Sequence, residues 1–255
     1  MKYYVIALLI FVFSCRNQNV QSQKNSAQWI YLFDGSSLEG WRAYNGSELP
    51  PGWGIINNEL TFSTEMILEQ DYDYQGSRDL IYAAQKFENF ELYLEWKIPP
   101  GGNSGIFYHV VEGFSGIPIV APEYQLIDDY HYTDFHDITA YNKSIGFTEN
   151  PQDLQPLQST GADYAMHAPD PQKKQLNPAG EWNSSRIVFT PQRVEHWLNG
   201  KLLLNFKPWT PEWETKKSNG KWGLAPKYGS YRKGYIGLQD HGSSLWFRNI
   251  KIKEL

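Results

Sequence analysis

The stretch that decides the fold is Phe90-Glu91-Leu92-Tyr93-Leu94-Glu95-Trp96-Lys97-Ile98. From Leu92 to Ile98 the even positions are all apolar, whereas the odd positions of the stretch hold Glu, Tyr, Glu and Lys. Successive side chains of a β-strand point to opposite faces of the sheet, so this alternation predicts a strand with one face against a core.

Similar short runs continue through the chain, separated by clusters of Gly, Pro, Asn and Asp, and no long stretch has a helical period. Residues 99–105 predict a loop or a wide hairpin turn, with 106–111 as the returning strand. Asn199-Gly200 predicts a two-residue hairpin turn between strands 193–198 and 201–206, because both central positions of that turn require positive φ. Further strands are expected at 59–64, 123–128, 185–190, 235–239 and 245–253. The pattern predicts an all-β, antiparallel sandwich with long loops.

Residues 130–180 interrupt this rhythm with many Asp, Gln and Pro residues and an aromatic and histidine cluster at 130–136. We expect long loops here, and a loop region of this length in a compact domain usually serves binding or forms a lid. Neither a composition shift nor an internal repeat divides the chain, so a single domain is expected over residues 29–255.

Composition excludes several classes of protein. With 41% hydrophobic, 16% aromatic and 20% charged residues, the chain is too aromatic and too weakly charged for a disordered or coiled-coil protein. One cysteine cannot close an intramolecular disulfide. The net charge of −5, without a basic run, argues against nucleic acid as a partner.

The N-terminus predicts export from the cytoplasm. The apolar run at 3–13 is far shorter than the ~20 residues that cross a bilayer, so residues 1–14 are expected to be a signal peptide. The end of the run, Val12-Phe13-Ser14-Cys15, resembles a bacterial lipoprotein signal, which implies a lipid on Cys15; the alternative is an ordinary signal peptide with Cys15 as a spare thiol. Residues 15–28 would form a flexible tether. The protein is thus expected in the cell envelope, periplasmic or on the outer membrane, contacting the membrane only through its anchor and using no nucleotide cofactor.

Two pairs of polar residues are candidates for a site. On the strand at 123–128, Glu123 and Gln125 project from the same face; the alternative is an outer, solvated face of the sheet. Gln239 and His241 repeat this spacing beside Gly237, whose missing side chain lets a ligand approach the backbone. Two such pairs together strengthen the prediction of a site.

One curved face of a sandwich can form a groove, and further side chains are candidates to line it. Asn103, in Asn103-Ser104-Gly105, serves either turn formation or ligand binding, and Glu95 and His109 could converge on the groove. His196 alternates with apolar residues and is expected in the core. The histidines lack the spacing of a usual zinc motif, and no serine or cysteine nucleophile arrangement is present.

Several short strings occur in the order typical of one family and extend from Trp29 to Leu255. They are Leu32-Phe33-Asp34-Gly35, Leu38-Glu39-Gly40-Trp41, Gly102-Asn103-Ser104-Gly105-Ile106, Glu123-Tyr124-Gln125-Leu126-Ile127-Asp128, Gly180-Glu181-Trp182-Asn183, His196-Trp197-Leu198-Asn199-Gly200, Ile236-Gly237-Leu238-Gln239-Asp240-His241 and Phe247-Arg248-Asn249-Ile250. The chain resembles the 3-keto-disaccharide hydrolase domain family. This resemblance implies a concanavalin A-like or glucanase-like jelly roll, often on secreted or lipid-anchored bacterial proteins, that acts on glycosides oxidised at C3.

The resemblance leads to a hypothesis about chemistry. A ketone at C3 acidifies the proton on C2, so a base can remove that proton while donors or a cation stabilise the enolate, and the C1 oxygen is then expelled, with or without later addition of water. We expect Glu123 or His241 as the base. The polar contacts to the sugar are expected from Asn103, Gln125 and Gln239, with Glu95 and His109 as second-rank candidates.

Three further points stay open from the sequence. A divalent cation could stabilise the enolate, with Glu123, His109 and His241 as the ligands to test. A non-catalytic carbohydrate-binding lipoprotein would have the same fold. An ordinary retaining or inverting glycosidase is a third hypothesis, because Glu123-x-Gln125-x-x-Asp128 is similar to the acidic strand motif of laminarinase-like jelly rolls, although Gln125 departs from it.

Overall fold

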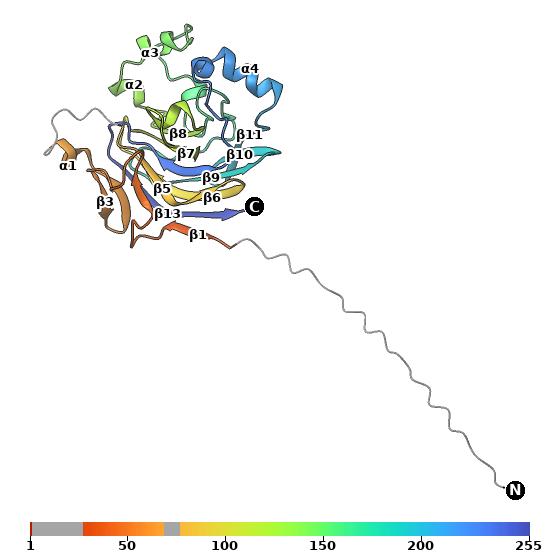
Figure 1. Cartoon of the computed structure of the whole chain (residues 1–255). Helices are drawn as coiled ribbons and strands as arrows, with labels where there is room; N and C mark the ends of the chain where they lie inside the picture. The colour runs from red at the N-terminus through yellow and green to blue at the C-terminus, as the bar shows by residue number, and fades with distance from the viewer. Residues whose placement is uncertain (2–27, 69–76) are drawn as a thin grey trace.

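The computed structural model describes residues 1, 28–68 and 77–255, and its strands form two antiparallel sheets (Figure 1). Cys15, the predicted signal peptide beyond Met1 and the predicted tether up to residue 27 lie outside the described residues. Within the described part of the chain, no helix is long and apolar enough to cross a membrane.

The larger sheet has eight strands in the order β11-β10-β9-β6-β13-β4-β3, with β1 paired to β13. Its strands are β1 (Ile30–Phe33), β3 (Trp53–Ile56), β4 (Glu59–Phe62), β6 (Phe90–Lys97), β9 (Asn183–Thr190), β10 (Arg193–Leu198), β11 (Lys201–Phe206) and β13 (Leu245–Glu254). The turn between β10 and β11 is the predicted one, since Asn199 and Gly200 have φ values of 46° and 78°.

The smaller sheet has five strands in the order β2-β5-β12-β7-β8. They are β2 (Trp41–Ala43), β5 (Leu80–Phe87), β7 (Asn103–Val110), β8 (Glu123–Ile127) and β12 (Gly234–Leu238). Of the two alternatives for the segment between β6 and β7, the loop is confirmed and the hairpin turn is wrong, because β6 belongs to the larger sheet and β7 to the smaller one. The loop at 98–102 therefore carries the chain across the sandwich.

The alternation predicted for residues 90–98 is confirmed. In β6, Phe90, Leu92, Leu94 and Trp96 are at most 1% exposed, and the residues between them are only half-buried. The buried row joins one large apolar cluster that also contains Ile106, Tyr124, Leu126, Ile236 and Leu238 of the smaller sheet. The two inner faces thus form a shared core, and the predicted all-β jelly-roll sandwich is confirmed.

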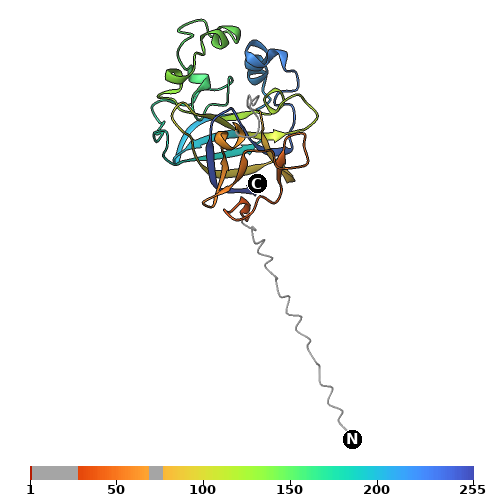
Figure 2. The same cartoon turned by 90° about the vertical axis from the view of Figure 1, so that its left-hand side faces the viewer.

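Most of the short helices lie over the smaller sheet, on the side away from the larger one, whereas the helix at 64–68 lies beside β3 (Figures 1 and 2). The helical segments are α1 (Thr64–Leu68), η1 (Ile117–Ile119), α2 (Tyr132–Phe135), α3 (Thr139–Ser144), η2 (Pro156–Gln158), α4 (Pro211–Asn219) and η3 (Lys221–Leu224). All residues of β7 and β8 are buried. The outer face of the smaller sheet is therefore covered over β7 and β8, whereas Gln85 of β5 is only half-buried.

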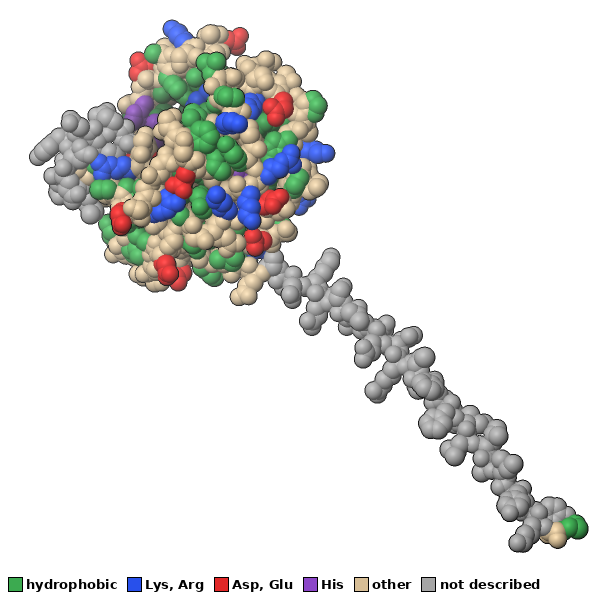
Figure 3. All heavy atoms as spheres, in the orientation of Figure 1, with side chains coloured by type: hydrophobic (Ala, Val, Ile, Leu, Met, Phe, Trp, Pro, Cys, Tyr) green, Lys and Arg blue, Asp and Glu red, His purple; other side chains and the backbone are tan. Residues whose placement is uncertain are grey.

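Helix α4 is an element that the strand-based prediction omits. Its start has a recognisable signal, because Pro211 stands at the first turn and the Thr210 hydroxyl accepts a hydrogen bond from the Trp213 backbone N–H at 3.2 Å. On the face shown in Figure 3, Lys and Arg side chains are interspersed with Asp and Glu, so this face carries no continuous basic patch.

Substitutions at two neighbouring residues of β6 test which face of this strand points into the core. We expect Leu94→Ala to reduce the free energy of unfolding by about 2–5 kcal/mol, because it leaves a cavity in a fully buried position. Glu95→Ala should cost only about 0–1 kcal/mol, because the Glu95 carboxylate lies on the outer face in a partly exposed ion pair. Urea unfolding of both variants measures the difference, and similar losses would contradict the assignment of faces.

Candidate active site

A groove lies over the outer face of the smaller sheet and has two adjoining lobes. The polar lobe measures about 280 Å³ and the apolar lobe about 340 Å³. Both are lined by Asn103, Gln125, Tyr141, Tyr164 and His241. The polar lobe is completed by Tyr44, Ser77, Asp79, Ser115, Gly116, Pro118, Glu123, Lys221, Gln239 and Asp240, and the apolar lobe by Ile127, Tyr132, His136, Asp137, Ile138, Leu154 and Gln158.

Five of the seven predicted site residues meet in the polar lobe, namely Asn103, Glu123, Gln125, Gln239 and His241. The strands explain this meeting, because β7 pairs with both β8 and β12. Glu123 and Gln125 are each only 3% exposed, so the alternative of a solvated sheet face is wrong.

Glu95 does not reach the groove. It lies on the outer face of the larger sheet, because the inward positions of β6 are the even-numbered ones. There its carboxylate accepts hydrogen bonds from Arg248 Nε at 2.6 Å and Asn249 Nδ2 at 2.9 Å. The expectation that Glu95 converges on the site is wrong.

His109 is also placed elsewhere. Its φ of 56° breaks the alternation of β7, and its ring packs edge-on against Phe189 with the centroids 4.3 Å apart. The ring nitrogen Nε2 lies 2.9 Å from the Glu88 carbonyl oxygen, and burial lowers the pKa of His109 to about 4. His109 therefore does not join Glu123 and His241 as a third metal ligand, and the described residues contain no group of three or more His, Cys, Asp or Glu side chains placed to hold a metal ion.

His196 is buried, as predicted. It is 0% exposed, its Nδ1 lies 3.0 Å from the Gly161 carbonyl oxygen, and burial lowers its pKa to about 4. It belongs to the core rather than to the site.

The Glu123 carboxyl occupies space that a glycine leaves free. Gly105 of β7 has no side chain, and a Cβ at that position would collide with Glu123 Oε1. Burial raises the pKa of Glu123 to about 8; the Lys221 ammonium opposes this rise, and the carboxyls of Asp79 and Asp163 add to it. Glu123 is thus an acid that is held largely protonated at neutral pH and becomes a strong base when ionised.

Asp79 is a second carboxyl in the polar lobe, and sequence reasoning missed it. Burial raises its pKa to about 7, and the charge of Asp240 adds to this rise. The hydrogen bond that Asp79 Oδ1 accepts from the Asp240 backbone N–H at 2.9 Å lowers the pKa and so opposes the rise. Asp79 directly precedes β5, whose Leu80 pairs with Leu238 of β12. Knowledge of this pairing would have placed Asp79 near Gln239.

The cation of the polar lobe is Lys221, at the start of η3. Its Nζ donates a hydrogen bond to the Tyr141 hydroxyl at 2.8 Å and lies 4.3 Å from the centroid of the Tyr164 ring. The two tyrosine hydroxyl oxygens are 2.7 Å apart, and burial raises the pKa of Tyr164. The Tyr141 oxygen accepts from the ammonium, and either hydroxyl can be the donor between the two tyrosines. Lys221 and Tyr141 lie 80 positions apart in the sequence, and no local motif connects them.

Two buried acceptors of the polar lobe lack a hydrogen-bond partner among the described residues. These are Asn103 Oδ1 and Gln239 Oε1. A buried acceptor without a partner costs about 1–3 kcal/mol, so such atoms are suited to receive hydroxyl groups of a ligand.

His241 lies at the exposed edge of the groove and lines both lobes. Loss of hydration within the groove lowers its pKa; the Asp240 carboxylate opposes this change, and the charges of Lys221 and His136 add to it. The imidazole is therefore mainly neutral at pH 7 and can accept or donate a hydrogen bond.

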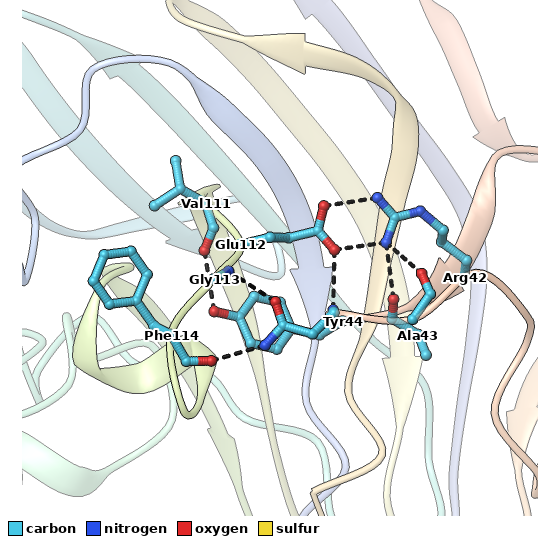
Figure 4. Close-up of polar contacts among 9 residues, drawn as sticks. Arg42, Ala43, Tyr44, Val111, Glu112, Gly113 and Phe114 are labelled. Carbon is cyan, nitrogen blue, oxygen red and sulfur yellow. Dashed lines mark hydrogen bonds and ion pairs between the residues drawn. The ribbon is translucent and has the colours of Figure 1, made fainter.

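An ion pair fixes the rim of the polar lobe (Figure 4). Arg42 binds Glu112 through two hydrogen bonds of 2.6 and 2.7 Å, and the Asn45 backbone N–H donates to the same carboxylate at 3.0 Å. Asn45 also donates to the Phe114 carbonyl oxygen and accepts from the Gly113 N–H, both at 2.8 Å. These contacts connect the end of β2 to the loop that supplies Ser115 and Gly116.

The groove of this jelly-roll sandwich holds three carboxyls (Asp79, Glu123 and Asp240), a lysine and two amide acceptors without a partner among the described residues, which suits the binding and processing of a small polar molecule. Residues 28–253 match the model of the 3-keto-alpha-glucoside-1,2-lyase-like domain. The chain belongs to this family of glycoside-cleaving enzymes, which confirms the resemblance deduced from the sequence.

Two kinds of relatives agree with this assignment. The chain is 36% identical over 248 residues to a 3-keto-disaccharide hydrolase of Bacteroides thetaiotaomicron, covering 89% of this chain and 78% of the relative. It is 36% identical to a putative glycosyl hydrolase of Parabacteroides distasonis whose crystal structure aligns with a TM-score of 0.75, over 89% of this chain and 94% of the other. A second such structure from the same organism, at 24% identity, has a TM-score of 0.58 and shares the fold.

The space above Gly105 gives a direct test of the site. We expect Gly105→Ala to remove most activity, because the added methyl group would displace the Glu123 carboxyl. Gly54→Ala is the matched control, since a Cβ there meets no atom within 4 Å in strand β3. Turnover assays and circular dichroism on both variants separate loss of the site from loss of the fold. Full activity in Gly105→Ala would contradict the position of Glu123.

The raised pKa of Glu123 predicts a pH-dependent stability. Between the unfolded pKa of about 4.5 and the folded pKa of about 8, the folded state binds more protons, so stability falls as pH rises. Glu123→Gln should therefore raise the Tm by several degrees at pH 9 and leave it nearly unchanged at pH 4, since each kcal/mol corresponds to about 2–4 °C.

Glu95→Gln is the control with the opposite sign. Burial opposes the shift, but hydrogen bonds from Arg248 and Asn249 lower the pKa of Glu95 overall, so its stabilising effect is present above its unfolded pKa and lost in acid. This variant should lower the Tm at pH 9. Equal effects of the two variants across pH would contradict the burial of the Glu123 carboxyl.

Proposed function

We propose that the protein cleaves glycosides that carry a ketone at C3, by removing the C2 proton and then expelling the oxygen on C1. One observation carries this proposal: the polar lobe is lined both by the Glu123 carboxyl, whose pKa is about 8, and by the Lys221 ammonium. The names of the family and of the Bacteroides relative support the substrate class.

The groove supplies the groups that each step needs. Ionised Glu123 takes the C2 proton, and the electron pair of that C–H bond moves through C2–C3 onto the ketone oxygen. The Lys221 ammonium stabilises the resulting enolate. When the ketone re-forms, a C1–C2 double bond forms, the C1–O bond breaks, and the departing oxygen takes up a proton. The products are an unsaturated 3-keto sugar and the free alcohol.

Addition of water across the new double bond, with hydroxyl on C1 and hydrogen on C2, gives the free 3-keto sugar. A lyase step followed by hydration is thus equivalent to hydrolysis, which agrees with a family described as lyase-like and a relative named a hydrolase. An ordinary glycosidase instead needs two carboxyls on either side of the bond and passes through an oxocarbenium-like transition state.

Of the two predicted bases, we assign the proton transfer to Glu123. It lies inside the polar lobe with Lys221, whereas His241 lies at the edge where the two lobes meet. That position suits a hydrogen bond from His241 to the oxygen between sugar and leaving group. Asn103, Gln125 and Gln239 would bind the sugar hydroxyls.

Export and lipid attachment form a separate proposal, which rests on the sequence of residues 1–28 alone. We propose that Cys15 carries lipid and that the domain acts in the cell envelope. Mass spectrometry of the mature protein, with Cys15→Ser as the control, tests this; an unmodified Cys15 would contradict it.

The proposed reaction is tested by turnover of a 3-keto-glucoside and of its unoxidised parent, with and without chelator, with aglycone release followed by mass spectrometry. Release from the keto sugar alone supports the enzyme, and Glu123→Gln should lower kcat by about 10²–10⁴-fold. Binding of both sugars without release would instead favour the carbohydrate-binding lipoprotein. Near-normal turnover in Glu123→Gln would assign the base elsewhere.

The pH profile identifies the base through its neighbours. With Glu123 as the base, kcat/KM should rise with pH around pH 8. Asp79→Asn removes a negative neighbour, so the rise should move to lower pH, and Asn retains an oxygen for the Asp240 N–H. Lys221→Met removes the positive neighbour, so the rise should move to higher pH, with a loss of kcat. Lys207→Met, at an exposed position, should leave the profile unchanged. Shifts of both site variants in one direction would contradict the assignment.

A further inference from the structure

The two lobes differ in how much hydrogen-bonding capacity is left for a ligand. Two acceptors are buried and unpaired within the described part of the chain: Asn103 Oδ1, on the wall that the two lobes share, and Gln239 Oε1, in the polar lobe alone. Both atoms fit hydroxyl donors, so the polar lobe suits the oxidised sugar ring. The apolar lobe shares five lining residues with it and is therefore the space into which the group on C1 extends.

The three polar side chains that line only the apolar lobe, Gln158, His136 and Asp137, are each bound to the protein. The Gln158 amide donates to Asn142 Oδ1 at 2.7 Å and accepts from the Gln155 backbone N–H at 2.9 Å. His136 Nε2 lies 2.9 Å from the Gly101 carbonyl oxygen, and Asp137 accepts from the Thr139 backbone N–H at 2.9 Å. These partners leave few groups for the hydroxyls of a second sugar.

Apart from Gln158, His136 and Asp137, the side chains that line only this lobe are apolar or aromatic. Ile127, Tyr132 and Ile138 form a small buried cluster against which Leu154 packs. The Tyr132 hydroxyl is bound by Asn103 Nδ2 at 3.3 Å, and its ring lies 4.4 Å from the His136 ring, between centroids. At about 340 Å³ the lobe has the size of a small-molecule site.

We infer that the apolar lobe binds the leaving group of the glycoside and selects an aromatic alcohol over a second sugar. This inference rests on the proposed function, because it assigns the leaving-group side of the same groove. A flat aromatic ring gains from contact with Ile138 and Leu154, whereas a sugar would lose hydration against these two side chains, which offer it no hydrogen bond.

The test compares phenyl 3-keto-glucoside with a disaccharide of 3-keto-glucose and glucose. Because the two alcohols differ in intrinsic reactivity, the informative quantity is the change in the ratio of the two kcat/KM values on mutation. Leu154→Asn should lower kcat/KM for the phenyl substrate about tenfold, mainly through KM, and change that for the disaccharide less than twofold. Leu202→Asn, at a similarly half-buried position on β11, should leave the ratio unchanged. Equal losses for both substrates, or the same ratio change in Leu202→Asn, would overturn the inference.

A binding experiment tests this inference independently of the proposed reaction. If neither keto-glycoside is cleaved, the proposed function fails, but calorimetric titration with unoxidised phenyl and methyl glucosides still tests the lobe. Tighter binding of the phenyl compound that is lost in Leu154→Asn supports an aromatic site. Equal affinities for the two glucosides would overturn it.

Discussion

The site depends on a buried carboxyl, that of Glu123, which has no ion pair with a cation among the described residues. Glu123 lies on a strand that is covered on both faces, and the space for its carboxyl exists only because Gly105 on the neighbouring strand lacks a side chain. Burial in such a place disfavours the ionised form and raises the pKa to about 8. The fold therefore keeps a reactive base at a cost in stability, and the surrounding elements are arranged around it.

The covering of the smaller sheet makes this burial achievable. The larger sheet turns a salt-bridged face outwards, whereas the smaller sheet lies under α2, α3 and α4 (Figures 1 and 2). Helix α3 delivers Tyr141, the loop after η2 delivers Tyr164, and η3, which follows α4, delivers Lys221. The covering segments therefore also provide the cation and the hydroxyls of the groove. Exclusion of water strengthens each electrostatic interaction between these groups and a substrate.

The sequence predicted most of the fold, because the alternation in strands such as β6 and the turn at Asn199-Gly200 are local signals. It also predicted that Glu123 and Gln125 meet Gln239, His241 and Asn103, which lie on or next to adjacent strands. The prediction failed where the position of a residue depends on an irregular backbone angle or on which strands pair across the fold. The positive φ of His109 reverses the face that alternation assigns, and the crossing at 98–102 separates β6 from β7. Lys221 and Asp79 join the site only through sheet pairing and loop packing, for which no local pattern exists.

The central claim is that the bond is broken through loss of the C2 proton. The most direct measurement uses a 3-keto-glucoside with deuterium on C2, with mass spectrometry of the sugar product at early times and a parallel incubation without enzyme to correct for spontaneous exchange. We predict a sugar product that has lost the deuterium, whether or not water has been added. A product that retains all deuterium at C2, formed as fast as from the undeuterated substrate, would show direct hydrolysis and contradict the account.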